Sequence, residues 1–160
     1  MRISHEDTKT RRTTWLGLRV FVTSWLILLV TGHSMAGQAS TPRVLDKGDR
    51  SQIMSRREAV VRTAAEWDAL WRAHLPARAP AAVDFSKEMI VGVFLGSKPT
   101  PGYGVTVLSA AEEGKVLLVR YRETSPPSDA IAAQVITFPY QIVAIPKSSA
   151  SEVTFEKVRN

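Results

Sequence analysis

The chain has 160 residues and contains 21 lysine and arginine residues, 15 aspartate and glutamate residues and no cysteine. The lack of cysteine excludes disulfides, thiolate metal sites and catalysis by a cysteine nucleophile. It does not exclude an exported domain, since a chain of this length can bury enough apolar surface to fold without disulfides. The net charge of +6 is concentrated at the N-terminus, where residues 1–19 hold five basic and two acidic side chains.

Residues 1–36 have the organisation of a secretory signal peptide. The basic segment is followed by a short apolar core, Val20–Val30, and by the small residues Ser34 and Ala36 around a cleavage site. We expect cleavage after Ala36 or Ala39. An uncleaved membrane anchor is the alternative, but a span needs about 20 apolar residues and Arg19 cuts this run short. The leader therefore predicts a bacterial protein that is periplasmic or secreted, without an integral membrane span after cleavage.

Removal of the leader changes the charge argument. The net charge falls from +6 to +3, and the remaining charges are mixed in sign, without a basic run or interleaved aromatic residues. We therefore do not expect nucleic-acid binding. Residues 37–50 are polar and predict a flexible lead-in, and residues 51–160 predict a single domain.

The first elements of this domain are a strand and a helix. Residues 53–62 alternate loosely and predict an edge strand, where three consecutive charged residues would discourage pairing with another chain. Thr63 and Glu66 then fit a capping box at the start of a helix, and Pro76 ends it. Apolar residues at helical spacing form one stripe that we expect to pack on a sheet: Trp67, Leu70, Trp71 and Leu75.

A seven-residue apolar run, Met89–Leu95, predicts a strand buried on both faces. It leads through Gly96 into a loop with two prolines, Pro99 and Pro101, which ends at Tyr103. Each proline ring fixes one φ angle, so the loop can present a surface at little entropic cost. This pattern favours recognition over catalysis.

Further strands complete the domain. Residues 104–108 and 116–122 predict a hairpin with a turn at Glu112–Gly114. A second proline loop follows, and residues 135–145 predict a long strand that bends at Phe138–Tyr140. Residues 153–155 predict a last short strand. The expected fold is α+β, a mostly antiparallel sheet or sandwich of five or six strands with one amphipathic helix.

The sequence offers little for catalysis. His74 stands alone near the end of the helix, where a cation would interact well with the helix dipole. Ser97 and Lys98 are adjacent in an extended segment, so their side chains point to opposite faces. Glu123 and Asp129 flank the second proline loop, but solvated acids are commoner there than a working pair. We expect no enzyme activity, no catalytic residue, no metal site and no cofactor.

Several motifs, in their order and spacing, resemble the C-terminal domain of the PrcB family, which is named for a protease complex subunit. The similarity covers roughly residues 51–157, and its most specific part is the loop, in which Pro101 stands where the family usually has Gly. The same loop is also similar to the Gly-Tyr loop of chagasin-type cysteine-protease inhibitors. The motifs are E-W-D-A-L-W (Glu66–Trp71), D-F-S-K-E-M-I-V (Asp84–Val91), G-S-K-P-T-P-G-Y (Gly96–Tyr103), the pair Pro126-Pro127, and F-P-Y-Q-I-V-A-I-P-K (Phe138–Lys147).

The resemblance implies an exported, non-catalytic protein that binds a protein partner, with a protease suggested by the family name. A protease inhibitor that uses the same loop and a small-ligand carrier are alternatives. A purely structural role for Gly102 and Tyr103, which would only fill the end of the sandwich, is a further one. We expect the contact surface to consist of Lys98, Pro99, Thr100, Pro101, Gly102 and Tyr103, with Pro126, Pro127, Pro139 and Tyr140 beside it if the loops converge.

Overall fold

A computed structural model describes residues 40–129, 131 and 133–159. The predicted signal peptide and its cleavage site lie outside these residues. Within the described part, no helix is long and apolar enough to cross a membrane.

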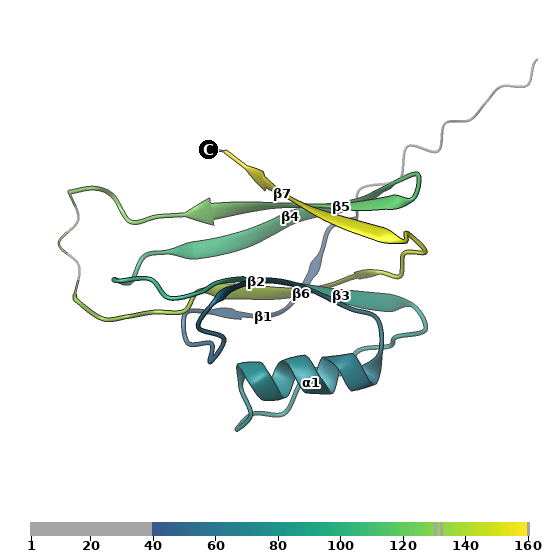
Figure 1. Cartoon of the computed structure of the whole chain (residues 1–160), viewed down its shortest axis with the longest axis horizontal. Helices are drawn as coiled ribbons and strands as arrows, with labels where there is room; N and C mark the ends of the chain where they lie inside the picture. Colours follow the sequence, from purple (N-terminus) through teal and green to yellow (C-terminus); the bar gives the residue numbers. More distant parts are fainter. Residues whose placement is uncertain (1–39, 130, 132, 160) are drawn as a thin grey trace, which may run out of the picture. The chain divides into compact units, whose positions relative to one another are not determined.

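Two β-sheets pack face to face, and one helix covers the outer face of the larger sheet (Figure 1). The four-stranded sheet has the order β1-β6-β3-β2 and is entirely antiparallel. The three-stranded sheet has the order β4-β5-β7, in which β7 runs parallel to β5. The strands are β1 (Arg43–Gly48), β2 (Arg56–Val61), β3 (Glu88–Leu95), β4 (Gly104–Glu113), β5 (Val116–Thr124), β6 (Tyr140–Pro146) and β7 (Glu152–Val158).

The one helix among the described residues, α1 (Ala64–His74), begins at the predicted capping box. The amide of Glu66 donates to the Thr63 hydroxyl, and the Glu66 carboxylate accepts from the amide of Thr63 in return. This exchange satisfies amides that a helix start leaves without partners. The apolar stripe buries Trp67, Leu70 and Trp71 against the sheet, as the sequence predicts.

Strand β3 is the centre of the domain, because it contributes to both apolar layers. Its odd-numbered residues, from Met89 to Leu95, face the three-stranded sheet, whereas Ile90 and Phe94 face the helix. The prediction of a strand buried on both faces is confirmed. The α+β, mostly antiparallel fold is confirmed as well, and residues 40–159 as described contain seven strands instead of five or six.

Two segments differ from the sequence-based expectation. Residues 43–48, expected within a flexible lead-in, form the edge strand β1 through pairing with β6. Strand β6 begins only at Tyr140, after the expected interruption, and Val135 and Ile136 before it are exposed. In both cases a segment becomes a strand only where a neighbouring strand pairs with it, because apolar character alone does not determine pairing.

Candidate binding surface

The proline loop leaves β3 through a tight contact with the segment before β2. Gly96 has a φ of +70°, and a Cβ built on it would lie 2.8 Å from the Arg56 nitrogen. The next residue, Ser97, donates its amide to the carbonyl of Met54 at 2.9 Å. Both the positive φ and the close approach require glycine here. The exit of the loop is therefore fixed by backbone contacts.

A short backbone bridge then ties the loop to the segment that leads into β6. The amide of Lys98 donates to the Thr137 carbonyl at 2.8 Å, and the amide of Thr137 donates back at 2.9 Å. The Thr137 hydroxyl also donates to the carbonyl of Thr100 at 3.2 Å. With Pro99 and Pro101 constraining the chain between these anchors, the loop is held in one conformation before any partner arrives.

The two proline loops meet at Gly102. Its φ is +98°, and a Cβ on it would lie 2.9 Å from Cβ of Pro126, so Gly102 leaves room only for the Pro126 ring beside it. On the same loop, Lys98 Nζ lies 5.4 Å from the centre of the Tyr103 ring, within range of a cation–π contact. The loops therefore form one surface. We call it the loop surface, defined as Lys98, Pro99, Thr100, Pro101, Gly102, Tyr103, Pro126 and Pro127.

The residues of the loop surface differ in exposure from the two other residues expected beside them. Pro99, Gly102 and Pro127 are exposed, and the other five members are partly exposed. Pro139 is fully buried, and Tyr140 is only 5% exposed. Pro139 is held by its carbonyl, which accepts from the amide of Leu95 at 2.9 Å. The structure thus brings Pro139 and Tyr140 beneath the surface, and a partner cannot reach Pro139.

A cleft of about 360 Å³ adjoins the loop surface at Tyr103. One wall is the start of β4 and the end of β5, and the other is the end of β1 with the residue that follows it. The small exposed part of Tyr140 contributes to its lining. The cleft gives the loop surface a concave neighbour in which a partner side chain can lie.

Sequence reasoning missed three exposed apolar side chains near the loop. Met54 is 69% exposed, Val135 is 54% exposed and Ile136 is 63% exposed. Met54 hydrogen-bonds through its carbonyl to Ser97, and Ile136 precedes the residue that bridges to Lys98. Exposed apolar side chains that gather in one place are typical of interaction sites. For Val135 and Ile136 the reason is that their apolar pattern predicts part of a strand.

Beneath the helix, the structure assembles a serine, a histidine and an aspartate that are far apart in the sequence. The Ser51 hydroxyl lies 2.9 Å from Nδ1 of His74, and Nε2 of His74 lies 3.6 Å from Oδ2 of Asp46. The Tyr140 hydroxyl donates to the same Asp46 oxygen at 3.2 Å. The Nε2 atom has no hydrogen-bond partner. We call Asp46, Ser51, His74 and Tyr140 the buried polar cluster.

The buried polar cluster has the composition of a catalytic triad but not its accessibility. His74 has no exposed surface, Ser51 is 4% exposed, and the Ser51 hydroxyl accepts from the amide of Ile53. Burial lowers the pKa of His74 below its usual 6.5, and the Asp46 carboxylate offsets this only in part. His74 lies in the last turn of the helix, as expected, but burial disfavours the charged form that would interact with the helix dipole. Burial, together with Asp46, raises the pKa of Tyr140 to about 12.

On the opposite side of the sandwich, charged side chains connect the two sheets. Arg56 of β2 donates to the Tyr121 hydroxyl at 2.6 Å and to Glu123 at 2.7 Å. Lys157 of β7 reaches the other oxygen of Glu123 at 3.0 Å, and Tyr121 donates to Glu58. Burial alone would raise the pKa of Glu123, but the hydrogen bonds from Arg56 and Lys157 lower it overall. Glu123 thus has a structural role in place of the acid pair considered with Asp129.

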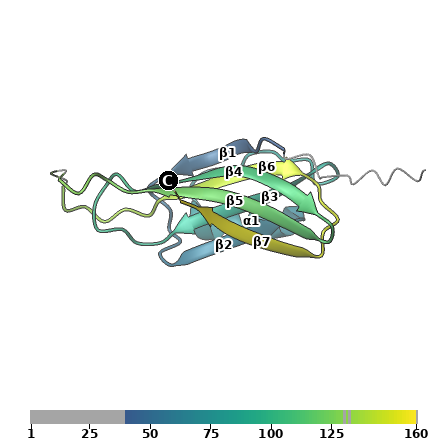
Figure 2. The same ribbon diagram turned by 90° about the horizontal axis from the view of Figure 1, so that it is seen from above.

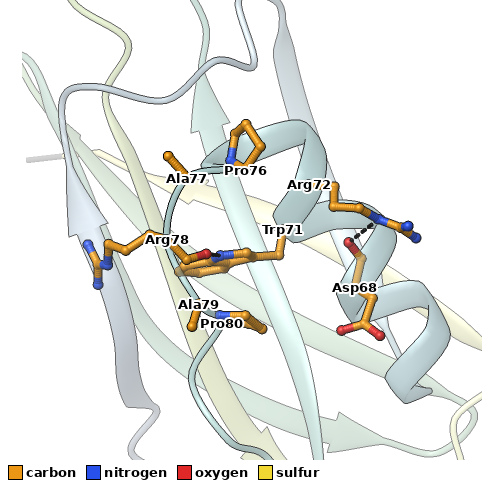
Figure 3. A pocket seen from close by; sticks show the side chains of 8 residues that line it. All are labelled: Asp68, Trp71, Arg72, Pro76, Ala77, Arg78, Ala79 and Pro80. Atoms are coloured by element: carbon orange, nitrogen blue, oxygen red, sulfur yellow. Dashed lines mark hydrogen bonds between the residues drawn. The ribbon is translucent and has the colours of Figure 1, made fainter.

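A second cavity, of about 450 Å³, lies at the end of α1 (Figure 3). It shares no lining residue with the loop surface. The Trp71 indole donates to the carbonyl of Arg78, whose guanidinium lies 5.8 Å from the Trp71 ring centre. Arg72 donates to the carbonyl of Asp68 within the helix. These contacts hold the segment that follows the helix against Trp71. The charged residues around the cavity are solvent-exposed. Among the described residues, no three potential ligands are grouped to hold a metal ion.

Comparison with known proteins identifies one segment of the chain. Residues 89–146 match the family model described as PrcB C-terminal. The matched segment runs from β3 to the end of β6 and includes every residue of the loop surface. The resemblance deduced from the motifs is confirmed over this range, while the helix motif at Glu66–Trp71 lies before it. No curated protein and no solved structure matches the chain.

Proposed function

We propose that this chain, whose residues 89–146 match the PrcB C-terminal family model, is an exported, non-catalytic module that binds a protein partner through the loop surface. The family name, which comes from a protease complex subunit, suggests a protease complex as the partner, in which the chain would be an accessory subunit. The leader supports a periplasmic or secreted location.

One observation carries this proposal: the most family-specific loop is both rigid and exposed. Backbone bonds to Met54 and Thr137 hold it at two points, while Pro99 and Gly102 face solvent. A loop that is ordered in advance loses little entropy on binding. Tyr103 adds a large side chain with a polar tip, which suits an anchor at an interface. Exposed Met54 and Ile136 extend the apolar area around it.

The absence of catalysis is also part of the proposal. The described residues that most resemble a catalytic set are those of the buried polar cluster, and a substrate cannot reach His74 or Ser51. The space between α1 and the sheet is filled by packed side chains, so we do not propose a small-ligand carrier. Its occupants include Trp67, Leu70, Trp71, Ile90, Phe94 and Ile142.

Site-specific photocrosslinking in intact cells tests the proposal. A photoreactive residue at Pro99 should capture a defined partner, whereas the same residue at Lys115 should not. Lys115 is an equally exposed position in the turn at the other end of β4, which makes it a matched control. Replacement of both Lys98 and Tyr103 with Ala should abolish the crosslink from Pro99 without unfolding the protein.

Two results would contradict the proposal. Identical partners captured from Pro99 and Lys115 would show contacts without specificity. Persistence of the Pro99 crosslink in the double alanine variant would show that the loop surface does not make the interface.

Inhibition of a protease is a second candidate, because two loops meet at one end of a two-sheet sandwich through Gly102 and Pro126. A pair of braced loops can enter an active-site cleft. The purified protein should then inhibit a protease at micromolar concentration or below, and Tyr103→Ala should weaken the inhibition. Inactivity against a broad protease panel would exclude this candidate but would leave the binding module standing.

A further inference from the structure

Strand β2 has a free edge next to the helix. It is the last strand of the four-stranded sheet, and in the part of the chain that the structure describes it pairs with β3 alone. Figure 2 shows β2 and β7 on the same side of the sandwich, where both sheets end. An edge strand presents unpaired backbone groups, and a second strand can bind them.

The register identifies which residues present these groups. Leu95 of β3 donates its amide to Pro139, so its backbone faces β6 and not β2. Leu95 lies opposite Arg56. Because hydrogen-bonded and non-hydrogen-bonded pairs alternate in an antiparallel ladder, the backbone groups of Arg56, Glu58 and Val60 point away from β3, toward the free edge.

A groove of about 550 Å³ runs along this edge. One wall is β2 from Arg57 to Val61, and the other is formed by three residues of the first turns of α1, Glu66, Ala69 and Leu70. Ala59, Val61 and Leu70 are buried members of the apolar layer under the helix. A strand added to β2 would therefore lie between an open backbone edge and a helix, with apolar side chains beside it.

The charges in the groove distinguish one position. The Glu66 carboxylate accepts from the amides of Arg62 and Thr63, and Glu58 accepts from Tyr121 on the other face of β2. Arg56 is likewise engaged with Tyr121 and Glu123. Arg57 is exposed, lines the groove and forms no ion pair within the described residues. Glu66 keeps its negative charge, but it lies at the Val61 end of the groove, where it binds the amides of Arg62 and Thr63. Arg57, at the other end, is the one basic side chain among the lining residues.

We propose that the groove between β2 and α1 binds an extended peptide segment of a partner protein by strand addition. The segment carries an acidic side chain opposite Arg57, followed at alternate positions by small apolar side chains opposite Ala59 and Val61. Strand alternation places these three positions on the helix-facing side, and the backbone groups of Arg56, Glu58 and Val60 supply the hydrogen bonds. This site is separate from the loop surface and does not depend on its function.

Hydrogen exchange on the full chain, read by nuclear magnetic resonance, tests the proposal with synthetic peptides. The probes are peptides of about eight residues with alternating threonine and valine, the usual length and composition of a strand. One valine is replaced by glutamate, glutamine or lysine, and both chain directions are made. In the free protein the amides of Arg56, Glu58 and Val60 should exchange fast, whereas those of Arg57, Ala59 and Val61 should be protected. The glutamate peptide should slow exchange at the first three.

Affinity gives the second readout. The glutamate peptide should bind about fivefold more tightly than the glutamine peptide, since an opposite-charge cross-strand pair contributes up to about 1 kcal/mol. Arg57→Glu should reverse the preference toward the lysine peptide. Arg122→Glu is the matched control, because Arg122 is exposed on β5 and lies outside the groove, and it should leave the ranking unchanged.

Three outcomes would overturn the proposal. The first is that no peptide slows exchange at Arg56, Glu58 and Val60. The second is slow exchange of these amides in the free protein, which would show that the edge is already occupied. If the exchange rate depended on protein concentration, the occupant would be a second copy of the chain. If it did not, the occupant would be a segment of the same chain. The third is that Arg57→Glu and Arg122→Glu change peptide ranking equally, so that only net charge matters.

Discussion

The buried polar cluster and the loop surface show opposite relations between residue type and role. The cluster holds the residues that chemists associate with catalysis, yet His74 is completely enclosed and Ser51 is nearly so. The loop surface holds prolines, a glycine and an aromatic residue, and much of it is open to solvent. Accessibility, more than residue type, therefore separates a structural site from a functional one in this domain.

The two regions differ in whether side chains or the backbone make their hydrogen bonds. In the cluster, side chains bond to one another and connect α1 to β1 and β6. In the loop surface, the backbone makes the bonds, to Met54 and Thr137, and the side chains are left available. The cluster should therefore dominate stability, and the loop surface should dominate binding.

The largest stability effects should come from substitutions in the buried polar cluster, of which His74→Ala is the first. The ring packs against Trp71, Phe94 and Tyr140 at centroid distances of 5.3, 5.5 and 4.2 Å. Its loss leaves a cavity and removes the partner of the buried Ser51 hydroxyl, which should lower the free energy of unfolding by about 3 kcal/mol or more. Urea denaturation measures the change. Arg72→Ala, an exposed neighbour on the same helix, should change it by about 0.5 kcal/mol or less. Equal effects of the two variants on the free energy of unfolding would contradict the view that the buried polar cluster dominates stability.

A smaller loss is expected for Gly96→Ala, at about 2 kcal/mol. The substituted residue would have to keep a left-handed conformation, which costs roughly 1–2 kcal/mol. It would also crowd the backbone near Arg56, only 2.8 Å away. Gly114→Ala is the control, because Gly114 has a similar φ of +65° with nothing within 4 Å. If the two variants unfold at the same urea concentration, the loop exit is not fixed as the structure indicates.

Much of the fold follows from local patterns. The capping box and the tryptophan stripe place α1, and the apolar run of β3 is continuous because both of its faces are covered. Strand β1 escaped prediction because its residues are mostly exposed and it exists only through pairing with β6. Local sequence contains no record of such a partner.

Only part of the candidate site could be predicted from the sequence, for a similar reason. The proline loop is visible because proline and glycine restrict the backbone directly. The contact of Gly102 with Pro126 joins segments more than twenty residues apart, so only the fold shows that the loops converge. Burial of Pro139 and Tyr140 depends on the packing of β6 and could not be deduced from their own positions.

The buried polar cluster should also make stability depend on pH. Burial lowers the pKa of His74 in the folded protein from 6.5, so the unfolded chain binds a proton that the folded protein resists. The stabilisation is therefore complete above pH 6.5 and declines as the pH falls toward the lowered pKa. Urea denaturation at a series of pH values between neutrality and about 5 measures this. The carboxylates with lowered pKa values titrate below this range, and His74→Gln should flatten the curve. An unchanged slope in that variant would assign the dependence to other groups.

A small stability effect and the largest binding effect should coincide at Tyr103. Its ring is partly exposed and contacts Lys98 through the cation–π pair, so Tyr103→Ala should cost less than about 1 kcal/mol in thermal or urea unfolding. Tyr140→Ala, which empties a 95%-buried site in the polar cluster, should cost about 3 kcal/mol or more. Crosslinking from Pro99 should respond in the reverse order once both variants are compared at a temperature where each is folded. A loss at Tyr103 as large as that at Tyr140 would mean that Tyr103 mainly fills the end of the sandwich, and the loop surface would then lose its anchor.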